Sequence, residues 1–175
     1  FSIEGDETVR VPANGFNLAA TLTKAPAAKG PQPAVVLIGG SGPADRDGTV
    51  AGIPVLGHLA RDLVQAGFVV VRYDKRGIGQ SGGRAGTAGL LYYAEDARAV
   101  VSYLRKSRRQ DVDGRRVAVI GHSEGAWVAL QLAATEKDIA ALVMVAGASE
   151  TGGALVLEQQ QHLLGIMQVS DEEKK

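Results

Sequence analysis

One serine in this sequence has the neighbours that nucleophilic chemistry requires. Ser123 lies in the stretch Gly121-His122-Ser123-Glu124-Gly125, between an apolar segment typical of a buried strand and an alanine- and leucine-rich segment typical of a helix. A serine hydroxyl is a weak nucleophile and must stand clear of the backbone to meet a base. A tight strand-to-helix turn exposes the serine but leaves no room for side chains two residues before and after it. Ser123 is therefore the candidate nucleophile, and Gly121 and Gly125 are the glycines of its turn.

The residue after this serine could supply a second part of the chemistry. The backbone N–H of Glu124 is expected at the N-terminus of the following helix, where the partial positive charge favours a negatively charged oxygen. Such a donor stabilises the oxyanion that forms when a carbonyl group is attacked.

The same Gly-x-Ser-x-Gly pattern occurs a second time, around Ser81. A loop that includes residues 75–78 separates this match from the preceding strand, and glycines rather than a helix follow it. The second match therefore lacks the context of the first, and we interpret Ser81 as an ordinary loop serine.

Alternating strands and helices would position these residues. Apolar runs predict strands at residues 8–11, 18–24, 34–38, 68–73, 117–120 and 139–145. Apolar residues at helical spacing predict helices at residues 54–66, 90–108, 126–134 and 152–168. This order predicts an α/β fold, with a mostly parallel sheet covered by helices on both faces. Asn14-Gly15 predicts a hairpin turn, so the first two strands would add an antiparallel edge.

Three polar loops follow strands of the parallel part, after residues 38, 73 and 121. Loops at the carboxyl ends of parallel strands meet at one edge of the sheet, where active sites of such folds lie. We therefore expect the three loops to converge on Ser123.

Composition excludes several other classes of protein. The 175 residues suffice for one domain, 45% are hydrophobic and 22% are charged, as in soluble globular proteins. Nineteen basic and nineteen acidic residues balance, so nothing favours nucleic acid or an acidic membrane as a partner. No apolar run could span a bilayer. No Gly-x-Gly-x-x-Gly directly follows a predicted strand, and neither a phosphate-binding lysine loop nor a histidine pair at ligand spacing occurs, so neither a metal nor an organic cofactor is implied. The chain begins at Phe1 without methionine, which leads us to expect that preceding sequence has been removed.

Three segments taken together resemble the α/β-hydrolase superfamily. They are Gly39-Gly40-Ser41-Gly42-Pro43 with Asp45-Arg46-Asp47, then Asp74-Lys75-Arg76-Gly77-Ile78-Gly79-Gln80-Ser81, then the turn around Ser123. The resemblance covers nearly all of residues 8–150 and is strongest to bacterial carboxylesterases near the serine-aminopeptidase and dienelactone-hydrolase-like branches. Family members often have His-Gly where this chain has Gly39-Gly40, so the loop is recognisable but its exact hydrogen-bond donor is open.

The resemblance implies roles for particular residues. Ser123 would be the nucleophile, and the oxyanion would be held by the backbone N–H groups of Glu124 and of Ser41 or Gly40. Asp74 and Arg76 are expected to brace loops. Asp45, Arg46 and Asp47 would either line the site or form a surface charge network, and the sequence does not distinguish these alternatives.

The base and the acid that such a serine needs are not evident in this chain. In the family both follow the nucleophile, and His162, in an expected helix, is the one histidine that does so here. His122 adjoins the nucleophile and is expected to pack under the turn, and we expect His58 and His162 not to be the base. The simplest interpretation is a fragment, with residues 1–150 forming the N-terminal part of a hydrolase core and residues 151–175 beginning a helical cap. Alternatively, another chain supplies the missing strands, and in both cases something should cover the sheet edge at residues 139–145.

Three functions remain open at this point. The first is hydrolysis of carboxylic esters of small molecules through an acyl-enzyme, although this chain alone would be inactive without its acid and histidine. The second is peptidase or acyltransferase activity with the same serine. The third is a non-catalytic binding domain that retains the turn as a relic.

Overall fold

The computed structural model describes residues 1–86, 88–106, 109–147 and 149–167. Its strands are β1 (Asp6–Pro12), β2 (Asn17–Thr23), β3 (Gln32–Ile38), β4 (Thr49–Val50), β5 (Ile53–Pro54), β6 (Val69–Tyr73), β7 (Val112–His122) and β8 (Ala141–Val145). Its helices are α1 (Val55–Gln65), α2 (Leu90–Lys106), α3 (Glu124–Thr135) and α4 (Gly152–Ile166). The expected order of strands and helices is confirmed. Residues 107–108 and 168, which two of the expected helices included, lie outside the described residues.

Six strands form one mixed sheet in the order β1-β2-β6-β3-β7-β8. β1 and β2 are an antiparallel hairpin at one edge, and β2 joins the sheet antiparallel to β6. The remaining pairs, β6 with β3, β3 with β7 and β7 with β8, are parallel. A mostly parallel sheet with a leading antiparallel hairpin is thus confirmed.

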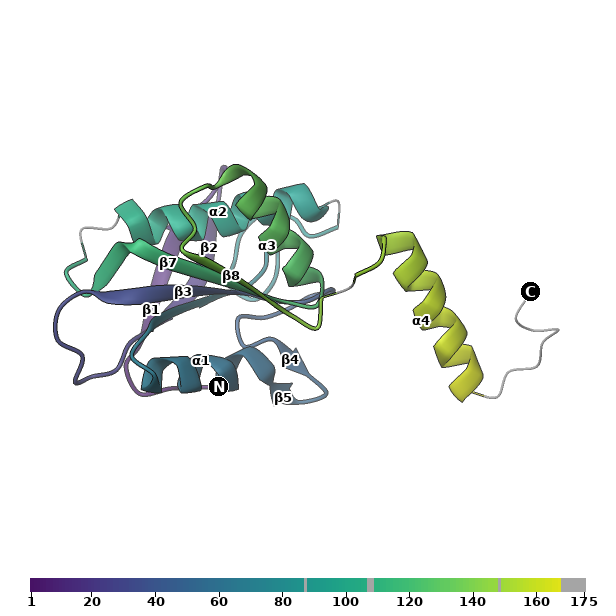
Figure 1. The fold of residues 1–175 in the computed structure, drawn as a ribbon, viewed down its shortest axis with the longest axis horizontal. Helices are drawn as coiled ribbons and strands as arrows, with labels where there is room; N and C mark the ends of the chain where they lie inside the picture. Colours follow the sequence, from purple (N-terminus) through teal and green to yellow (C-terminus); the bar gives the residue numbers. More distant parts are fainter. Residues whose placement is uncertain (87, 107–108, 148, 168–175) are drawn as a thin grey trace.

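Helices cover both faces of this sheet, as Figure 1 shows with α2 and α3 on one side and α1 on the other. Central strands buried on both faces need continuous apolar sequence, and all five residues of β6 are buried. Leu104 of α2 and Leu132 of α3 belong to the core on one face, and Leu56 and Ala60 of α1 to the core on the other. Packing in the two cores holds β3, β6 and β7 in place, and with them the starting points of the loops that follow these strands.

The other edge of the sheet is β8, which the described residues leave uncovered. Val143, Met144 and Val145 are 44%, 42% and 39% exposed, which is high for apolar residues in a strand. Strand edges with unpaired backbone groups can pair with further strands. Within the described part of the chain, β8 is therefore an apolar edge strand that pairs with another strand only on its β7 side.

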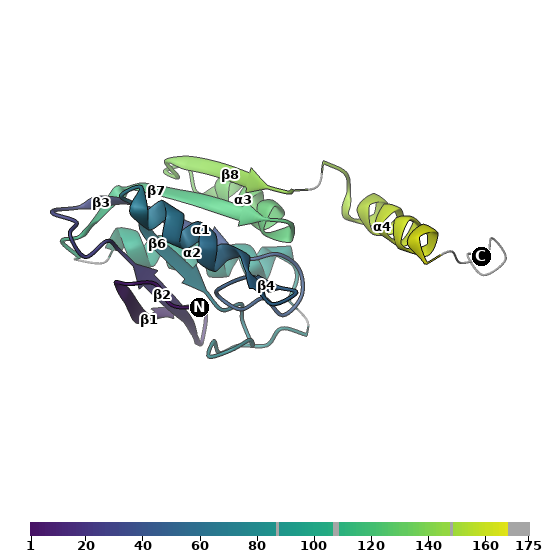
Figure 2. The same ribbon diagram turned by 90° about the horizontal axis from the view of Figure 1, so that it is seen from below.

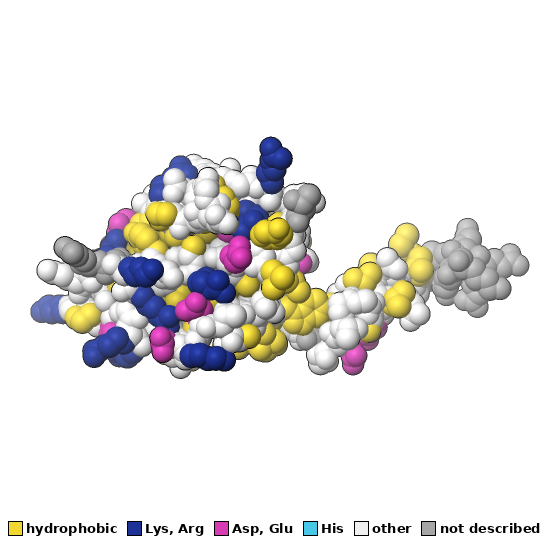
Figure 3. All heavy atoms as spheres, turned by 90° about the horizontal axis from the view of Figure 1, so that it is seen from above, with side chains coloured by type: hydrophobic (Ala, Val, Ile, Leu, Met, Phe, Trp, Pro, Cys, Tyr) yellow, Lys and Arg dark blue, Asp and Glu magenta, His cyan; other side chains and the backbone are white. Residues whose placement is uncertain are grey.

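Helix α4 stands away from the sheet and its covering helices (Figures 1 and 2). None of its side chains is buried, and Leu157, Leu163 and Ile166 are at least half exposed. Figure 3 shows hydrophobic side chains where the main body meets this helix and along the helix itself. Among the described residues, α4 approaches the main body at its N-terminal end, where Gly152 lies beside the Trp127 ring.

Two features differ from the elements expected from sequence. β7 begins at Val112 rather than at residue 117, with a register shift against β3 near Gln32 and Ala34. A short hairpin, β4–β5, lies at residues 49–54, where no strand was predicted and where Pro54 was expected to begin a helix. Among the described helices, none has the length and apolar character to cross a membrane.

Candidate active site

Ser123 occupies the bend between β7 and α3 in a backbone conformation that is uncommon for a residue with a side chain. Its φ is 54° and its ψ is −121°, and its N–H donates to Val145 O at 2.9 Å. The carbonyl of Ser123 accepts from Ala126 N–H at 3.0 Å. Its hydroxyl makes no capping hydrogen bond to the described amides of α3. A positive φ at a non-glycine residue is strain that packing must hold in place, and such residues cluster at functional sites.

The glycines around this bend are required by contact with backbone. A Cβ at Gly121 would overlap the carbonyl oxygen of Gly125, and a Cβ at Gly125 would overlap the carbonyl oxygen of Ile38. A Cβ at Gly40 would come within 3.2 Å of the Ser123 Cβ. The loop after β3 therefore runs directly beside the serine.

A cavity of about 480 Å³ opens at this serine. Its lining combines the serine and the loop after β3 with apolar residues of α3 and α4: Ser41, Ser123, Glu124, Trp127, Ala146, Gly152, Leu155, Val156 and Gln159. Ser41 and Glu124 thus lie on the same cavity as Ser123. The first N–H groups of a helix have no acceptor within the helix, so the Glu124 amide at the start of α3 is a donor for a group bound there.

Glu124 also carries an ion pair next to the serine. Lys75, from the loop after β6, donates from Nζ to Glu124 Oε1 at 2.8 Å. The same Nζ lies 4.4 Å from the centroid of the Tyr93 ring. Burial raises the pKa of the Tyr93 hydroxyl, and the nearby Glu124 carboxylate raises it further. Glu124, Lys75 and Tyr93 line a second cavity of about 290 Å³, so Glu124 lines both this cavity and the one at Ser123.

Asp74 joins the loops after β3 and β6. Its carboxylate accepts from Arg46 Nε at 3.0 Å, from an Arg46 terminal nitrogen at 2.7 Å, and from the Arg46 backbone N–H at 2.9 Å. It also accepts from the Gln80 N–H at 3.1 Å. Burial alone would raise the pKa of the Asp74 carboxyl, but the hydrogen bonds from Arg46 and Gln80 lower it overall. Asp74 therefore braces loops, as expected.

The sequence left open whether Asp45, Arg46 and Asp47 line the site or form a charge network, and their hydrogen-bond and ion-pair partners favour the charge network. Asp45 accepts from the backbone N–H groups of Asp47 and Thr49, both at 3.1 Å. Asp47 forms an ion pair with Arg72, whose side chain is 1% exposed. The three residues belong to a network of charges that shapes the loop after β3.

Two further residues of the loop after β6 form hydrogen bonds that hold this loop in place. Arg76 donates two hydrogen bonds to the buried Asp96 of α2, at 2.7 and 2.8 Å. Ser81 is buried, donates to Asp74 O at 2.7 Å and accepts from Ala19 N–H at 2.8 Å. Ser81 is thus a structural loop serine, in agreement with the interpretation from sequence.

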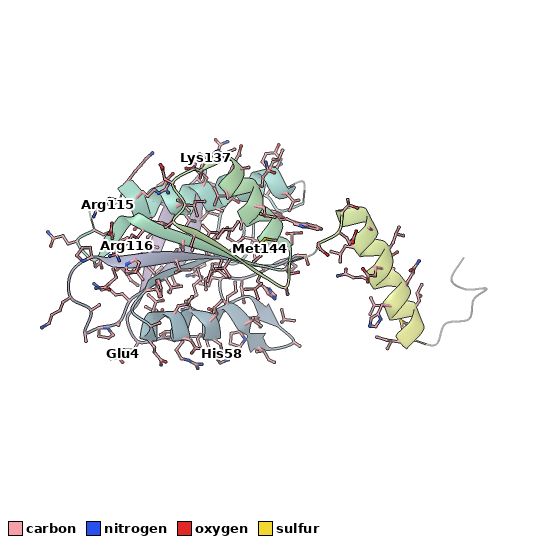
Figure 4. All side chains as sticks on the ribbon, in the orientation of Figure 1. Glu4, His58, Arg115, Arg116, Lys137 and Met144 are labelled. Carbon is pink, nitrogen blue, oxygen red and sulfur yellow. The ribbon has the colours of Figure 1, made fainter. Side chains whose placement is uncertain are left out.

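The three histidines lie at separate places. His122 ends β7 and is half-buried, with its carbonyl oxygen and Nδ1 beside Gly40. His58 lies on α1, on the opposite face of the sheet from α3 (Figure 4), and packs edge-on against Phe1 with ring centroids 4.9 Å apart. His162 is exposed on α4. Within the described residues, no three His, Cys, Asp or Glu side chains gather as a metal-binding group.

Sequence reasoning identified the loops of the site but missed several side chains that surround it. Trp127 and Leu155 line the cavity at Ser123. Lys75 pairs with Glu124 and lies over the Tyr93 ring. Trp127 lies one helical turn after Ser123, which was a usable signal. Lys75 and Tyr93 are separated from Glu124 by tens of residues, so no local pattern joins them.

Relatives of known sequence match this chain, among them an esterase and an uncharacterised protein. Esterase EstD of Thermotoga maritima is 31% identical over 171 residues, which are 98% of this chain and 40% of that protein. An uncharacterised protein of Mycobacterium tuberculosis is 41% identical over 108 residues, which are 61% of this chain and 36% of that protein. The chain therefore spans about two fifths of the length of the curated relatives it matches.

Solved structures share the fold. The alpha/beta hydrolase GrgF from Penicillium sp. sh18 superposes with a TM-score of 0.70 at 23% identity, over 90% of this chain and 53% of that one. A hypothetical protein from Pseudomonas aeruginosa gives a TM-score of 0.70 at 25% identity, over 99% of this chain and 56% of that one. Residues 48–170, more than half of the sequence, match the family described as Serine aminopeptidase, S33. The chain therefore belongs to this family, within the α/β-hydrolase superfamily.

Proposed function

We propose that this chain carries the nucleophile and oxyanion hole of a serine hydrolase that cleaves carboxylic esters. The observation that carries the proposal is the position of Ser123, which is held at φ 54° between β7 and α3 and lines one cavity with Ser41 and Glu124. Acyl transfer requires a nucleophilic hydroxyl and amide donors that face the same space.

The proposed reaction has two stages. A base takes the proton from Ser123 Oγ as that oxygen bonds to the ester carbonyl carbon, and the carbonyl oxygen becomes an oxyanion facing the N–H groups of Glu124 and of Ser41 or Gly40. The intermediate then expels the alcohol, which takes the proton from the base. Water activated by the same base adds to the acyl-enzyme, releases the carboxylic acid and restores the serine.

We further propose that the base and its acid lie in sequence following residue 175. His58 and His162 lie on α1 and α4, and His122 directly adjoins the serine in sequence. The segments aligned with this chain are 40% and 36% of the two relatives, so both relatives are longer than this chain. In this proposal residues 1–150 are the first part of the hydrolase core and residues 151–175 begin a helical cap. A further strand from the rest of the protein, or from another chain, would cover β8.

Two observations favour an ester over a peptide as substrate. The relative that aligns over nearly the whole chain is named an esterase. The cavity at Ser123 is lined in part by the apolar side chains of Trp127, Leu155 and Val156, which suits an uncharged acyl or alkyl group. The family description names an aminopeptidase, so peptide hydrolysis is the second candidate, and acyl transfer to an acceptor other than water is a third.

The experiment compares substrates with the chain extended beyond residue 175. We expect p-nitrophenyl butyrate to be hydrolysed much faster than an aminoacyl p-nitroanilide. Ser123→Ala should abolish the hydrolysis, and Ser102→Ala, a change on α2, should not affect it. A p-nitroanilide cleaved faster than the ester would favour the peptidase, and binding without turnover of either would favour a non-catalytic domain.

A further inference from the structure

The side chain of Glu124 poses an electrostatic problem for the proposed oxyanion hole. Its backbone N–H is a proposed donor to the oxyanion, whereas its carboxylate carries a negative charge on the same residue. Like charges repel strongly in partly buried surroundings, where the effective dielectric constant is low. The Glu124 side chain is only 27% exposed, so solvent screens its charge incompletely.

Lys75 provides the compensating charge from another loop. Its side chain is 6% exposed and its Nζ lies 2.8 Å from Glu124 Oε1. The Tyr93 ring lies 4.4 Å from the same Nζ, on a face that attracts cations. The ammonium is therefore held between a carboxylate and an aromatic ring.

The position of this pair in the sheet connects all three loops of the site. β3 lies between β6 and β7, so a pair joining the loop after β6 to the start of α3 passes over the end of β3. The Lys75 backbone N–H also donates to Ala44 O, in the loop after β3, at 3.3 Å. Lys75 thus contacts the loop that carries Gly40 and Ser41 and the residue that follows Ser123.

We infer that Lys75 is a positioning residue of the esterase, which fixes the Glu124 side chain and neutralises its charge so that the adjacent amide can stabilise an oxyanion. This inference rests on the proposed function of Ser123 and Glu124. It predicts a dependence on the sign of the charges, because an unpaired carboxylate opposes the oxyanion and an unpaired ammonium favours it. If the Lys75–Glu124 pair only braced two loops, removal of either partner would lower the reactivity of Ser123 to the same extent.

The test measures how fast a fluorophosphonate probe labels the extended chain. In this reaction Ser123 Oγ bonds to phosphorus, fluoride leaves and the hydroxyl proton passes to the base, so the phosphoryl oxygen uses the same amide donors. We expect Lys75→Met to slow labelling about tenfold and Glu124→Gln to accelerate it about threefold. The double variant should return to within about threefold of the wild-type rate. Lys24→Met, which removes a lysine at the opposite end of the sheet, serves as the matched control and should label at the wild-type rate.

The outcomes separate the inference from the function on which it rests. Labelling that persists in Ser123→Ala contradicts the proposed function itself. Labelling that depends on Ser123 but falls equally in Lys75→Met and Glu124→Gln contradicts the inference, as does an unchanged rate in Lys75→Met. Thermal unfolding of each variant checks its fold. If Lys75→Met does not fold, Glu124→Gln decides alone, with a faster rate supporting the inference and a rate equal to or below wild type overturning it.

Discussion

The strained conformation of Ser123 depends on the absence of side chains at its neighbours. The carbonyl oxygens of Gly125 and Ile38 lie where the Cβ atoms of residues 121 and 125 would be. Backbone atoms cannot move aside as the end of a long side chain can, so both positions exclude every residue except glycine.

Gly121→Ala should therefore destabilise the protein by about 2 kcal/mol or more, as overpacking in a rigid region does. Gly153→Ala is the matched control, because a Cβ at this position in α4 would meet nothing within 4 Å. Urea unfolding of both variants measures the effect. A free energy of unfolding for Gly121→Ala equal to that of wild type would contradict the description of the turn.

Asp74 offers a test of the charge network through pH. The pKa of Asp74 is lower in the folded protein than the ordinary aspartate value near 4. The ionised carboxylate therefore stabilises the folded protein fully at a pH above that ordinary value. This stabilisation is lost as the pH falls toward the folded-state pKa. Asp74→Asn should lower the free energy of unfolding by about 3 kcal/mol at pH 7, because the substitution leaves the partly buried Arg46 without its carboxylate partner.

The difference in free energy of unfolding between wild type and Asp74→Asn should narrow as the pH is lowered from 6 to 3. Asp62→Asn, which changes an exposed carboxylate beside Arg61, is the control and should leave stability nearly unchanged. A wild-type minus Asp74→Asn difference that stays constant over this pH range would rule out the proposed role of the ionised Asp74.

At the scale of elements, the sequence predicted which strands and helices form but not how the loops are joined. Apolar runs and helical spacing are local, so the central strands and their order along the chain could be predicted. The ion pairs of Lys75 with Glu124 and of Arg76 with Asp96 join residues far apart in sequence. Such contacts follow from the packing of the sheet and have no local signal.

The β4–β5 hairpin shows why a short element escaped prediction. Its two turn residues, Ala51 and Gly52, both have positive φ, at 49° and 79°. This turn normally selects asparagine, aspartate or glycine at both positions, and alanine gives no such signal. Each strand is two residues long, too short for an alternating pattern to be recognised.

The exposed edge strand β8 should make the 175-residue chain prone to association. Val143→Lys places a charge on this edge and should reduce association, because charged edges resist pairing with other strands. Leu130→Lys is the matched control, since Leu130 on α3 is equally exposed at 44% but its backbone is already paired within a helix. Light scattering at rising protein concentration compares them. Equal light scattering by the two variants at every protein concentration would show that β8 is not the site of association.

At the scale of the whole molecule, the described residues assemble one side of a candidate active site. The sheet brings Ser123, Ser41 and Glu124 to one cavity, and α4 contributes an apolar wall through its first turns. β8 lies beside β7, the strand that leads into Ser123, and the Val145 carbonyl of β8 accepts the Ser123 N–H. Any strand added at β8 would therefore extend the sheet next to the serine, which is where the proposal expects the remaining catalytic groups.

The most direct test of the account is to locate the residue that reacts with a fluorophosphonate in the extended chain. Digestion and mass spectrometry should find the probe on the peptide that contains Ser123, with none on the peptide that contains Ser81. Ser123→Ala should remove the label. A label on any other residue, or an unchanged label in Ser123→Ala, would contradict the assignment of Ser123 as the nucleophile.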